Sequence, residues 1–359
     1  MERRIVTSLG LGVVGVLANV HVAASLLERV DIGNGSIYLG PEDAPDSYVI
    51  GPFGKLDVAG ATVDRVTAYG GTIVIHDGGL VRSGIVAGKW LDVKDSTVHG
   101  GAQVGVVVQE GGVGNIADSL IDGGGLAVSA VALGTVNISR SSVSALKSGA
   151  SGYGWGAGVF GGRLNIGQGS DVVGLQNGAY ISSGRVAGHA TTFNVGSLVI
   201  DQATVQSIEG AALKVENVLG SDAFTDIVIK NGANLIAGNG RLLEVVEGGL
   251  VSFTVDGSVL QGELHSDSSS VLDVKLITGA RLAGNLFGIN SMAIGYDSRW
   301  LMSRSSEIGL MSLDGGSVGF TGDGFHSLSL GSLSGSGLFD MRINLDNASG
   351  DLLSVNGEA

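Results

Sequence analysis

The chain has 359 residues, of which 44% are hydrophobic, 63 are Gly and only 3 are Pro. This share of apolar residues is too high for an intrinsically disordered chain. The formal net charge of -14 argues against nucleic acid as a partner, because phosphate contacts need clustered Lys and Arg. The absence of Cys excludes a disulfide framework and metal sites held by thiolates.

The N-terminal residues 1–40 allow two interpretations. A basic start, an apolar run over residues 5–22 and a following Ala-Ala pair have the order of a secretory signal peptide that is cleaved before Ser25. Residues 20–26, however, show the alternating apolar pattern of the repeats that follow. We therefore expect residues 1–40 to form an N-terminal cap with the first coils, or in part a signal peptide.

Residues 41–329 are dominated by a short repeated sequence pattern. The pattern consists of an apolar residue, any residue and a second apolar residue, then two or three small or polar residues, and then a third apolar residue. Typical copies are GKLDVAGATV (Gly54–Val63), KWLDVKDSTV (Lys89–Val98) and GSLVIDQATV (Gly196–Val205). With the second apolar residue as anchor, the repeat is about 20 residues long, and the longest steps lie in the middle of the chain. The anchors are Val58, Ile75, Val93, Ile116, Ile138, Ile166, Ile200, Ile229, Phe253, Val274 and Ile294.

The repeats alternate with period two, which is typical of strands, and Gly, Asn, Asp and Ser stand at their joints, where turns need them. One such unit cannot bury its apolar face alone, whereas stacked units bury a continuous core. A β-propeller is the rival fold, but its units are about twice as long and usually carry aromatic signatures. The sequence therefore predicts an all-β fold, namely a single right-handed parallel β-helix, a solenoid of about 13–15 coils. Its handedness is expected from general experience with such folds.

The longer coils in the middle of the chain predict inserted loops, and the loops of solenoids often form the binding face. Three segments rich in Gly or Pro qualify as loops: Gly40–Gly54, Lys147–Phe160 and Gln176–Phe193. Their aromatic, Arg and His side chains suit contact with a glycan or a protein if they are exposed, and cover the core if they are buried. The candidate binding residues are Tyr48, Tyr153, Trp155, Tyr180, Arg185 and His189.

A β-helix enzyme that cleaves polysaccharide, as a lyase or hydrolase, is the enzymatic alternative, and it would need carboxylates that converge on an outer face. Asp57 and Asp92 take the same outward position two coils apart, with Val74 between them, and we interpret them as solvated surface residues. Asn137 and Asn165 also share a column, where a hydrogen-bonded ladder is expected rather than a site. The sequence has neither the nucleophile motif of a serine hydrolase nor paired His spacing. No catalytic residue, metal or cofactor is therefore predicted.

The C-terminal stretch Leu330–Ala359 reads LGSLSGSGLFDMRINLDNASGDLLSVNGEA. Its runs Gly335–Phe339, Met341–Leu345 and Gly350–Val355 resemble the closing segment of pertactin-type autotransporter passengers from Gram-negative bacteria. The preceding Asp297–Phe320 is similar to that family's last coils. We expect residues 330–359 to form these closing coils, after a β-helix with inserted loops over residues 41–329.

The resemblance implies a non-enzymatic, virulence-type passenger of type V secretion, which is exported through the periplasm and then secreted or exposed on the cell surface. Such a scaffold would present loops for adhesion to a host-cell protein or glycan. The resemblance also implies a C-terminal β-barrel translocator as a partner. None follows Ala359, so we expect the chain to be a fragment of a longer protein. We expect the chain to be a monomer, and a structural stalk or spacer is the other non-enzymatic interpretation.

Overall fold

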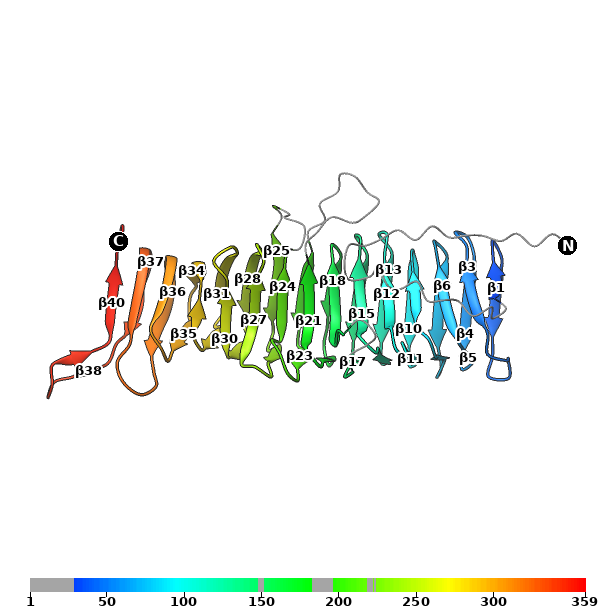
Figure 1. Cartoon of the computed structure of the whole chain (residues 1–359), viewed down its shortest axis with the longest axis horizontal. Helices are drawn as coiled ribbons and strands as arrows, with labels where there is room; N and C mark the ends of the chain where they lie inside the picture. The colour runs from blue at the N-terminus through cyan, green and yellow to red at the C-terminus, as the bar shows by residue number, and fades with distance from the viewer. Residues whose placement is uncertain (1–28, 148–151, 183–195, 218–221, 223) are drawn as a thin grey trace.

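The computed structural model describes residues 29–147, 152–182, 196–217, 222 and 224–359. The described strands wind around one long axis, and the coils follow one another from the blue end to the red end of the molecule (Figure 1). The ladders between successive coils are parallel, and each joins a strand to its counterpart in the next coil. The molecule is therefore a parallel β-helix, as predicted.

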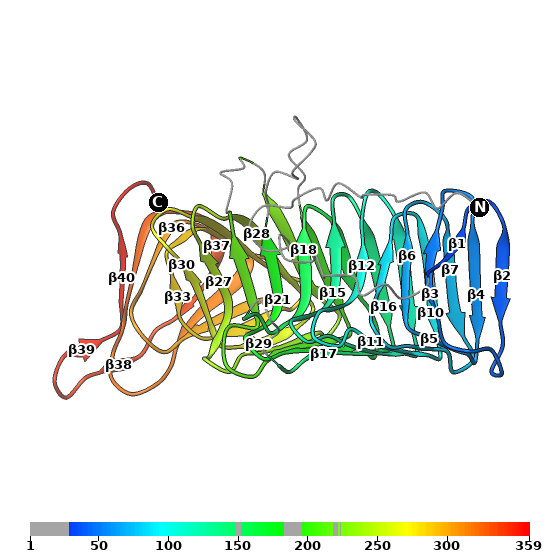
Figure 2. The ribbon, with the colours of Figure 1, turned by 45° about the vertical axis from the view of Figure 1, so that its right-hand side comes forward.

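Most coils contribute one strand to each of three sheets, which run along the axis (Figure 2). Sheet A consists of β1 (Arg29–Ile32), β3 (Ser47–Ile50), β6 (Arg65–Ala68), β9 (Ile85–Ala87), β12 (Val104–Val108), β15 (Leu126–Val131), β18 (Trp155–Phe160), β21 (Asn177–Ser182), β24 (Leu213–Glu216), β27 (Arg241–Val246), β30 (Glu263–Ser266) and β33 (Leu286–Phe287). Sheet C consists of β5 (Thr62–Val63), β8 (Leu80–Val81), β11 (Thr97–His99), β14 (Leu120–Asp122), β17 (Ser142–Ala145), β20 (Asp171–Gly174), β23 (Thr204–Ser207) and β26 (Asn234–Ile236).

Sheet B extends furthest and takes one strand from each of fifteen described coils, which agrees with the predicted number of coils. Its ladder is β2 (Ser36–Leu39), β4 (Lys55–Ala59), β7 (Thr72–His76), β10 (Trp90–Lys94), β13 (Val113–Ala117), β16 (Thr135–Ser139), β19 (Arg163–Ile166), β22 (Ser197–Asp201), β25 (Thr225–Lys230), β28 (Leu250–Asp256), β31 (Val271–Ile277), β34 (Ile289–Ile294), β36 (Ser306–Phe320), β37 (Ser327–Asp340) and β40 (Leu352–Val355).

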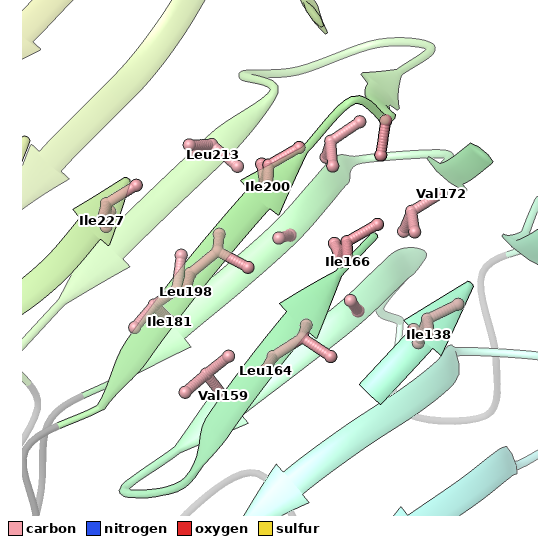
Figure 3. Close-up of a cluster of buried hydrophobic side chains, with 14 of the residues drawn as sticks. Ile138, Val159, Leu164, Ile166, Val172, Ile181, Leu198, Ile200, Leu213 and Ile227 are labelled. Atoms are coloured by element: carbon pink, nitrogen blue, oxygen red, sulfur yellow. The ribbon is translucent and has the colours of Figure 1, made fainter. Parts of the chain in front are cut away.

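The core lies inside the coils and consists of apolar side chains stacked in register. In β19, Leu164 and Ile166 point inward and are fully buried, and Leu198 and Ile200 of β22 take the same positions one coil later. Figure 3 shows these stacks side by side. The alternation in the sequence arises because successive side chains of a strand point to opposite faces, so every second residue enters the core.

Two of the predicted anchors, Phe253 and Val274, stand one inward position earlier on their strands than the column of the other anchors. Ile229 pairs with Val255 rather than with Phe253, and Phe253 pairs with Ile227 and Val274. Both Phe253 and Val255 are buried in the core. Because the alternation has period two, a shift by two residues keeps the same face inward, so the apolar pattern alone could not distinguish the two registers.

The corner between sheets B and C has the same backbone conformation in many coils. Asp77, Asp95, Asp118, Gln202 and Asn231 occupy this corner with φ between 46° and 57°. Asp and Asn tolerate this left-handed conformation better than most residues, because their short polar side chains can form local hydrogen bonds. The joints predicted from Gly, Asn, Asp and Ser therefore correspond to a repeated turn.

A column of serines follows this corner inside the molecule. The amide of Ser96 donates to Ser119 Oγ at 3.2 Å, and the amide of Ser119 donates to Ser141 Oγ at 3.1 Å. The hydroxyl of Ser119 in turn donates to the carbonyl of Ala117 at 2.6 Å. These side chains satisfy backbone amides that would otherwise be buried without a partner at the turn.

The last coils depart from the three-sheet pattern. The face that sheet C forms in the earlier coils continues through β29 (Val259–Gln261), β32 (Arg281–Ala283) and β35 (Arg299–Met302). The long strand β36 then runs through the corner between the two faces and pairs with both β34 and β35. A short antiparallel hairpin of β38 (Ile343–Asn344) and β39 (Ser349–Gly350) precedes β40. None of the described segments is a helix long and apolar enough to cross a membrane.

Candidate interaction site

The prediction that the candidate tyrosines and tryptophan stand on loops is wrong for three of them. Tyr48 lies on β3, Trp155 begins β18, and Tyr180 lies on β21. Tyr48 is only 5% exposed and belongs to the central core. These three segments are strands of sheet A. The repeated sequence pattern covers only the strand of sheet B and the start of the strand of sheet C in each coil, so it did not reveal the strands of sheet A.

Tyr153, Trp155 and Tyr180 come together on sheet A although they belong to two successive coils. The rings of Trp155 and Tyr180 are stacked, with centroids 3.8 Å apart and planes 8° apart, and Tyr153 lies against Trp155 at 4.3 Å. Trp155 and Tyr180 are 5% and 3% exposed, while Tyr153 is half-buried. Only Tyr153 of these three therefore offers a substantial part of its ring to a partner.

This aromatic cluster is separate from the central core and is completed by apolar neighbours. Phe160 packs beside Trp155 and Tyr180, with ring centroids 6.4 and 5.9 Å away. Gly158 is the register partner of Tyr180, and a Cβ at Gly158 would lie 2.6 Å from the Phe160 ring. Gly158 is therefore a packing residue in a strand, and the Gly-rich composition that suggested a loop reflects close contact. The further buried members are Val107, Leu126 and Val131.

Charged side chains fix the edge of the aromatic cluster. The Tyr180 hydroxyl donates to Glu216 Oε2 at 2.6 Å, and Lys214 Nζ pairs with Glu216 Oε1 at 2.6 Å. Burial raises the pKa of Tyr180, and its hydrogen bond to Glu216 raises it further, so the phenol stays neutral and acts as a donor. The site thus combines a partly exposed ring with an ion pair, and both are common in binding surfaces.

Sequence reasoning missed Glu216, Lys214 and the role of Phe160. The sequences WGAGVF of β18 and NGAYIS of β21 could have predicted strands only by alternating between apolar and polar residues. Because both strands are buried on both faces, this alternation is absent. The candidate residues Arg185 and His189 lie outside the described residues.

The carboxylates of the enzymatic alternative do occupy one outward column. Asp57, Val74 and Asp92 are register partners on successive coils, as predicted. Both oxygens of Asp57 are engaged, one by Lys55 and one by His76, each at 2.8 Å. Partial burial alone would raise the pKa of Asp57, but these two hydrogen bonds outweigh it and lower the pKa. A paired carboxylate with a lowered pKa is poorly suited to act as a general acid.

The asparagine ladder is confirmed. Asn165 Nδ2 donates to Asn137 Oδ1 at 2.7 Å, and Asn137 Nδ2 donates to Asn115 Oδ1 at 2.9 Å. Because the side-chain amides bond to one another along the coils, they stabilise the stacking of β13, β16 and β19. Within the part of the chain that the structure describes, no group of three or more His, Asp or Glu side chains is arranged to hold a metal ion.

Comparison with known proteins agrees with the fold and with the C-terminal motifs. Residues 308–359 match the Pertactin family model. A segment of 191 residues, 51% of this chain, is 25% identical to the BrkA autotransporter of Bordetella pertussis, and a segment of 152 residues, 39% of this chain, is 28% identical to the autotransporter adhesin/invasin TibA of Escherichia coli.

These similarities cover only part of the relatives, namely 19% of BrkA and 14% of TibA. The family match falls on β36, β37 and the closing strands, where the sequence resemblance was found. Both relatives are named autotransporters. The chain thus combines a parallel β-helix with a C-terminal segment that matches the Pertactin family model, and part of it is similar to two autotransporters.

Proposed function

We propose that the chain is a non-enzymatic passenger whose β-helix carries a surface for binding host cells. The observation that carries this proposal is the partly exposed ring of Tyr153, which packs against the buried Trp155 of sheet A. A Tyr ring that a packed neighbour holds in place contributes strongly to protein contacts, because it buries a large area at a small entropic penalty. The similarity to a relative named adhesin/invasin supports the same role.

The two alternatives have less support. A spacer needs no aromatic cluster on its outer face, and a polysaccharide-cleaving enzyme needs a free acid near a second carboxylate. Asp57 is instead held by Lys55 and His76. The half-exposed ring of Tyr153 and the Lys214–Glu216 pair are the groups that a bound partner could reach.

The test is binding of the purified 359-residue chain to cultured epithelial cells, measured by flow cytometry. We expect saturable binding that Tyr153→Ala weakens roughly tenfold, as for a hot-spot residue. Tyr69→Ala is the matched control, since Tyr69 is an exposed tyrosine of an early coil. The proposal fails if the chain does not bind cells, or if Tyr153→Ala binds as the unchanged chain does. Release of reducing sugars from host polysaccharide would favour the enzymatic alternative.

A further inference from the structure

The last coils contain a cleft that the proposed function does not use. Its volume is about 440 Å³, within the usual range for small-molecule sites. It lies where β32, β35, β36 and β37 follow one another, and its walls include Arg281, Arg299, Asp297 and Leu338. Gly316, Ser317 and Gly337 also line the cleft, and their small size leaves room in it.

Two arginines on neighbouring coils line this cleft. Arg281 and Arg299 are direct register partners, so their Cα atoms lie about 4.8 Å apart. Like charges directly opposite each other destabilise a sheet. Arg299 Nη2 is balanced by Asp340 Oδ2 at 2.8 Å, whereas the exposed Arg281 side chain forms no ion pair or hydrogen bond with any described residue. An anion bound to the unpaired Arg281 guanidinium would relieve this repulsion.

The position of Arg299 is fixed before any ligand arrives. Its guanidinium lies over Gly319 on the next coil, where a Cβ would come within 2.7 Å of Nη2. The bond to Asp340 holds it there from two coils away. Arg299 therefore supplies a fixed positive charge to the cleft, while Arg281 keeps its whole guanidinium free for a planar carboxylate and two parallel hydrogen bonds.

Apolar side chains and a hydrogen-bond acceptor lie at the rim of the cleft. Tyr296 is 80% exposed, and its ring lies beside Gly315, a residue of the cleft wall. Leu338 is 62% exposed on the opposite coil. Asp297 contributes a carboxylate that can accept hydrogen bonds from hydroxyl groups. A cationic pair, a flat ring and an acceptor around one small cleft match a ligand that is planar on one side, rich in hydroxyls and negatively charged.

We propose that this cleft binds a sugar residue that carries a carboxylate. Arg281 pairs with the carboxylate, Arg299 supports it, Asp297 accepts from the hydroxyl groups, and Tyr296 lies against the ring. Sialic and uronic acids share this chemistry. The cleft lies on different coils from the aromatic cluster, so the proposal goes beyond the proposed function and does not depend on it.

Isothermal titration calorimetry on the 359-residue chain tests the proposal, with sialyllactose and trigalacturonate as the acidic probes, lactose as the neutral probe and sodium sulfate as the bare anion. We expect one or both acidic sugars to bind and lactose to bind at least tenfold more weakly. Arg281→Ala should weaken acidic-sugar binding by roughly tenfold or more, because a charge-assisted hydrogen bond is lost. Arg281→Lys should recover only part of it, because an ammonium cannot form the paired contact.

Arg163→Ala is the matched control, because Arg163 is another exposed arginine of sheet B, on β19. It should bind as the unchanged chain does. The proposal is overturned if neither acidic sugar binds, if lactose binds equally well, if sulfate alone competes as strongly as the sugars, or if Arg281→Ala has no effect. Sugar binding that is lost in Arg281→Ala, with cell binding unchanged, would support the cleft and leave the test of the aromatic cluster independent.

Discussion

The middle of the molecule and its C-terminal end have the same ladder but very different burial. In β28 inward residues alternate strictly with outward ones, and Phe253 and Val255 are fully buried. In β37 only Leu328 and Leu330 are buried, and the following residues to Asp340 are exposed or half-buried. The apolar core thus becomes thinner toward the C-terminal strands, where backbone pairing carries a larger share of the stability than in the middle.

Polar contacts take the place of the core at the C-terminal end. The fully buried side chain of Asp351 accepts hydrogen bonds from Arg342 and from the amide of His326. Arg342 also donates to the carbonyls of Gly322 and Gly324 and so ties the hairpin to the preceding turn. The two regions should therefore respond differently to truncation of apolar side chains and to pH.

The largest expected difference comes from truncating one apolar residue in each region. Phe253→Ala should lower the free energy of unfolding by about 3–5 kcal/mol, because it leaves a cavity in the core. Leu338→Ala should change it by less than about 0.5 kcal/mol, because the side chain is already in solvent. Urea unfolding followed by circular dichroism measures both. Equal midpoint shifts would contradict the contrast between the regions.

A smaller effect is expected from acid, and it should include opening of the C-terminal hairpin. Burial alone would raise the pKa of Asp351, but the hydrogen bonds from Arg342 and His326 outweigh it and lower the pKa to about 2. A lowered pKa means that the stabilisation is complete above the unfolded value near 3.8 and is lost as the pH falls toward 2. Hydrogen exchange, corrected for its intrinsic pH dependence, should show residues 341–353 opening in this window.

Asp351→Asn is the control for the acid effect, because its side chain cannot titrate. In this variant the hairpin should exchange faster than in the unchanged chain at neutral pH and should show little further change down to pH 2. Peptides around Phe253 should stay protected in both proteins. If the middle coils opened first on acidification, the assignment to Asp351 would be wrong.

The smallest expected effect is removal of one hydroxyl from the serine column. Ser119→Ala removes the acceptor of the Ser96 amide and should destabilise the turn by about 1 kcal/mol. Ser142→Ala, at an exposed position on the next coil, should have an effect below about 0.5 kcal/mol. Exchange of the Ser96 amide reports the change directly. No faster exchange in Ser119→Ala would mean that the hydrogen bond contributes nothing.

The sequence predicted the scaffold better than the surface, for a physical reason. Strands of sheet B face the core on one side and solvent on the other, so Leu164 and Ile166 follow a readable alternation. Trp155 and Tyr180 lie on strands that are buried on both sides, where alternation disappears and Gly suggests loops. The period of the repeat could therefore be read, whereas the strands of sheet A could not.

The arginine pair could have been found from the repeat itself. Arg281 and Arg299 both stand directly before the apolar residue that follows the turn, in GARL and DSRWL. Equal offsets from a turn predict register partners on adjacent coils. Gly319 and Asp340, which position the Arg299 side chain, come from later coils, and the sequence does not reveal their position because β36 and β37 lack the usual corner.

The strand ladders join successive coils at a constant spacing, so the number of coils sets the distances along the molecule. A coil duplicated or deleted between β21 and β32 would move the arginine cleft by about 4.8 Å relative to the aromatic cluster, while neither group of residues would change. Spacing between the two surfaces can thus vary in discrete steps during evolution, independently of their chemistry. For a partner that binds both surfaces, the number of coils between them would set the distance that the partner must span.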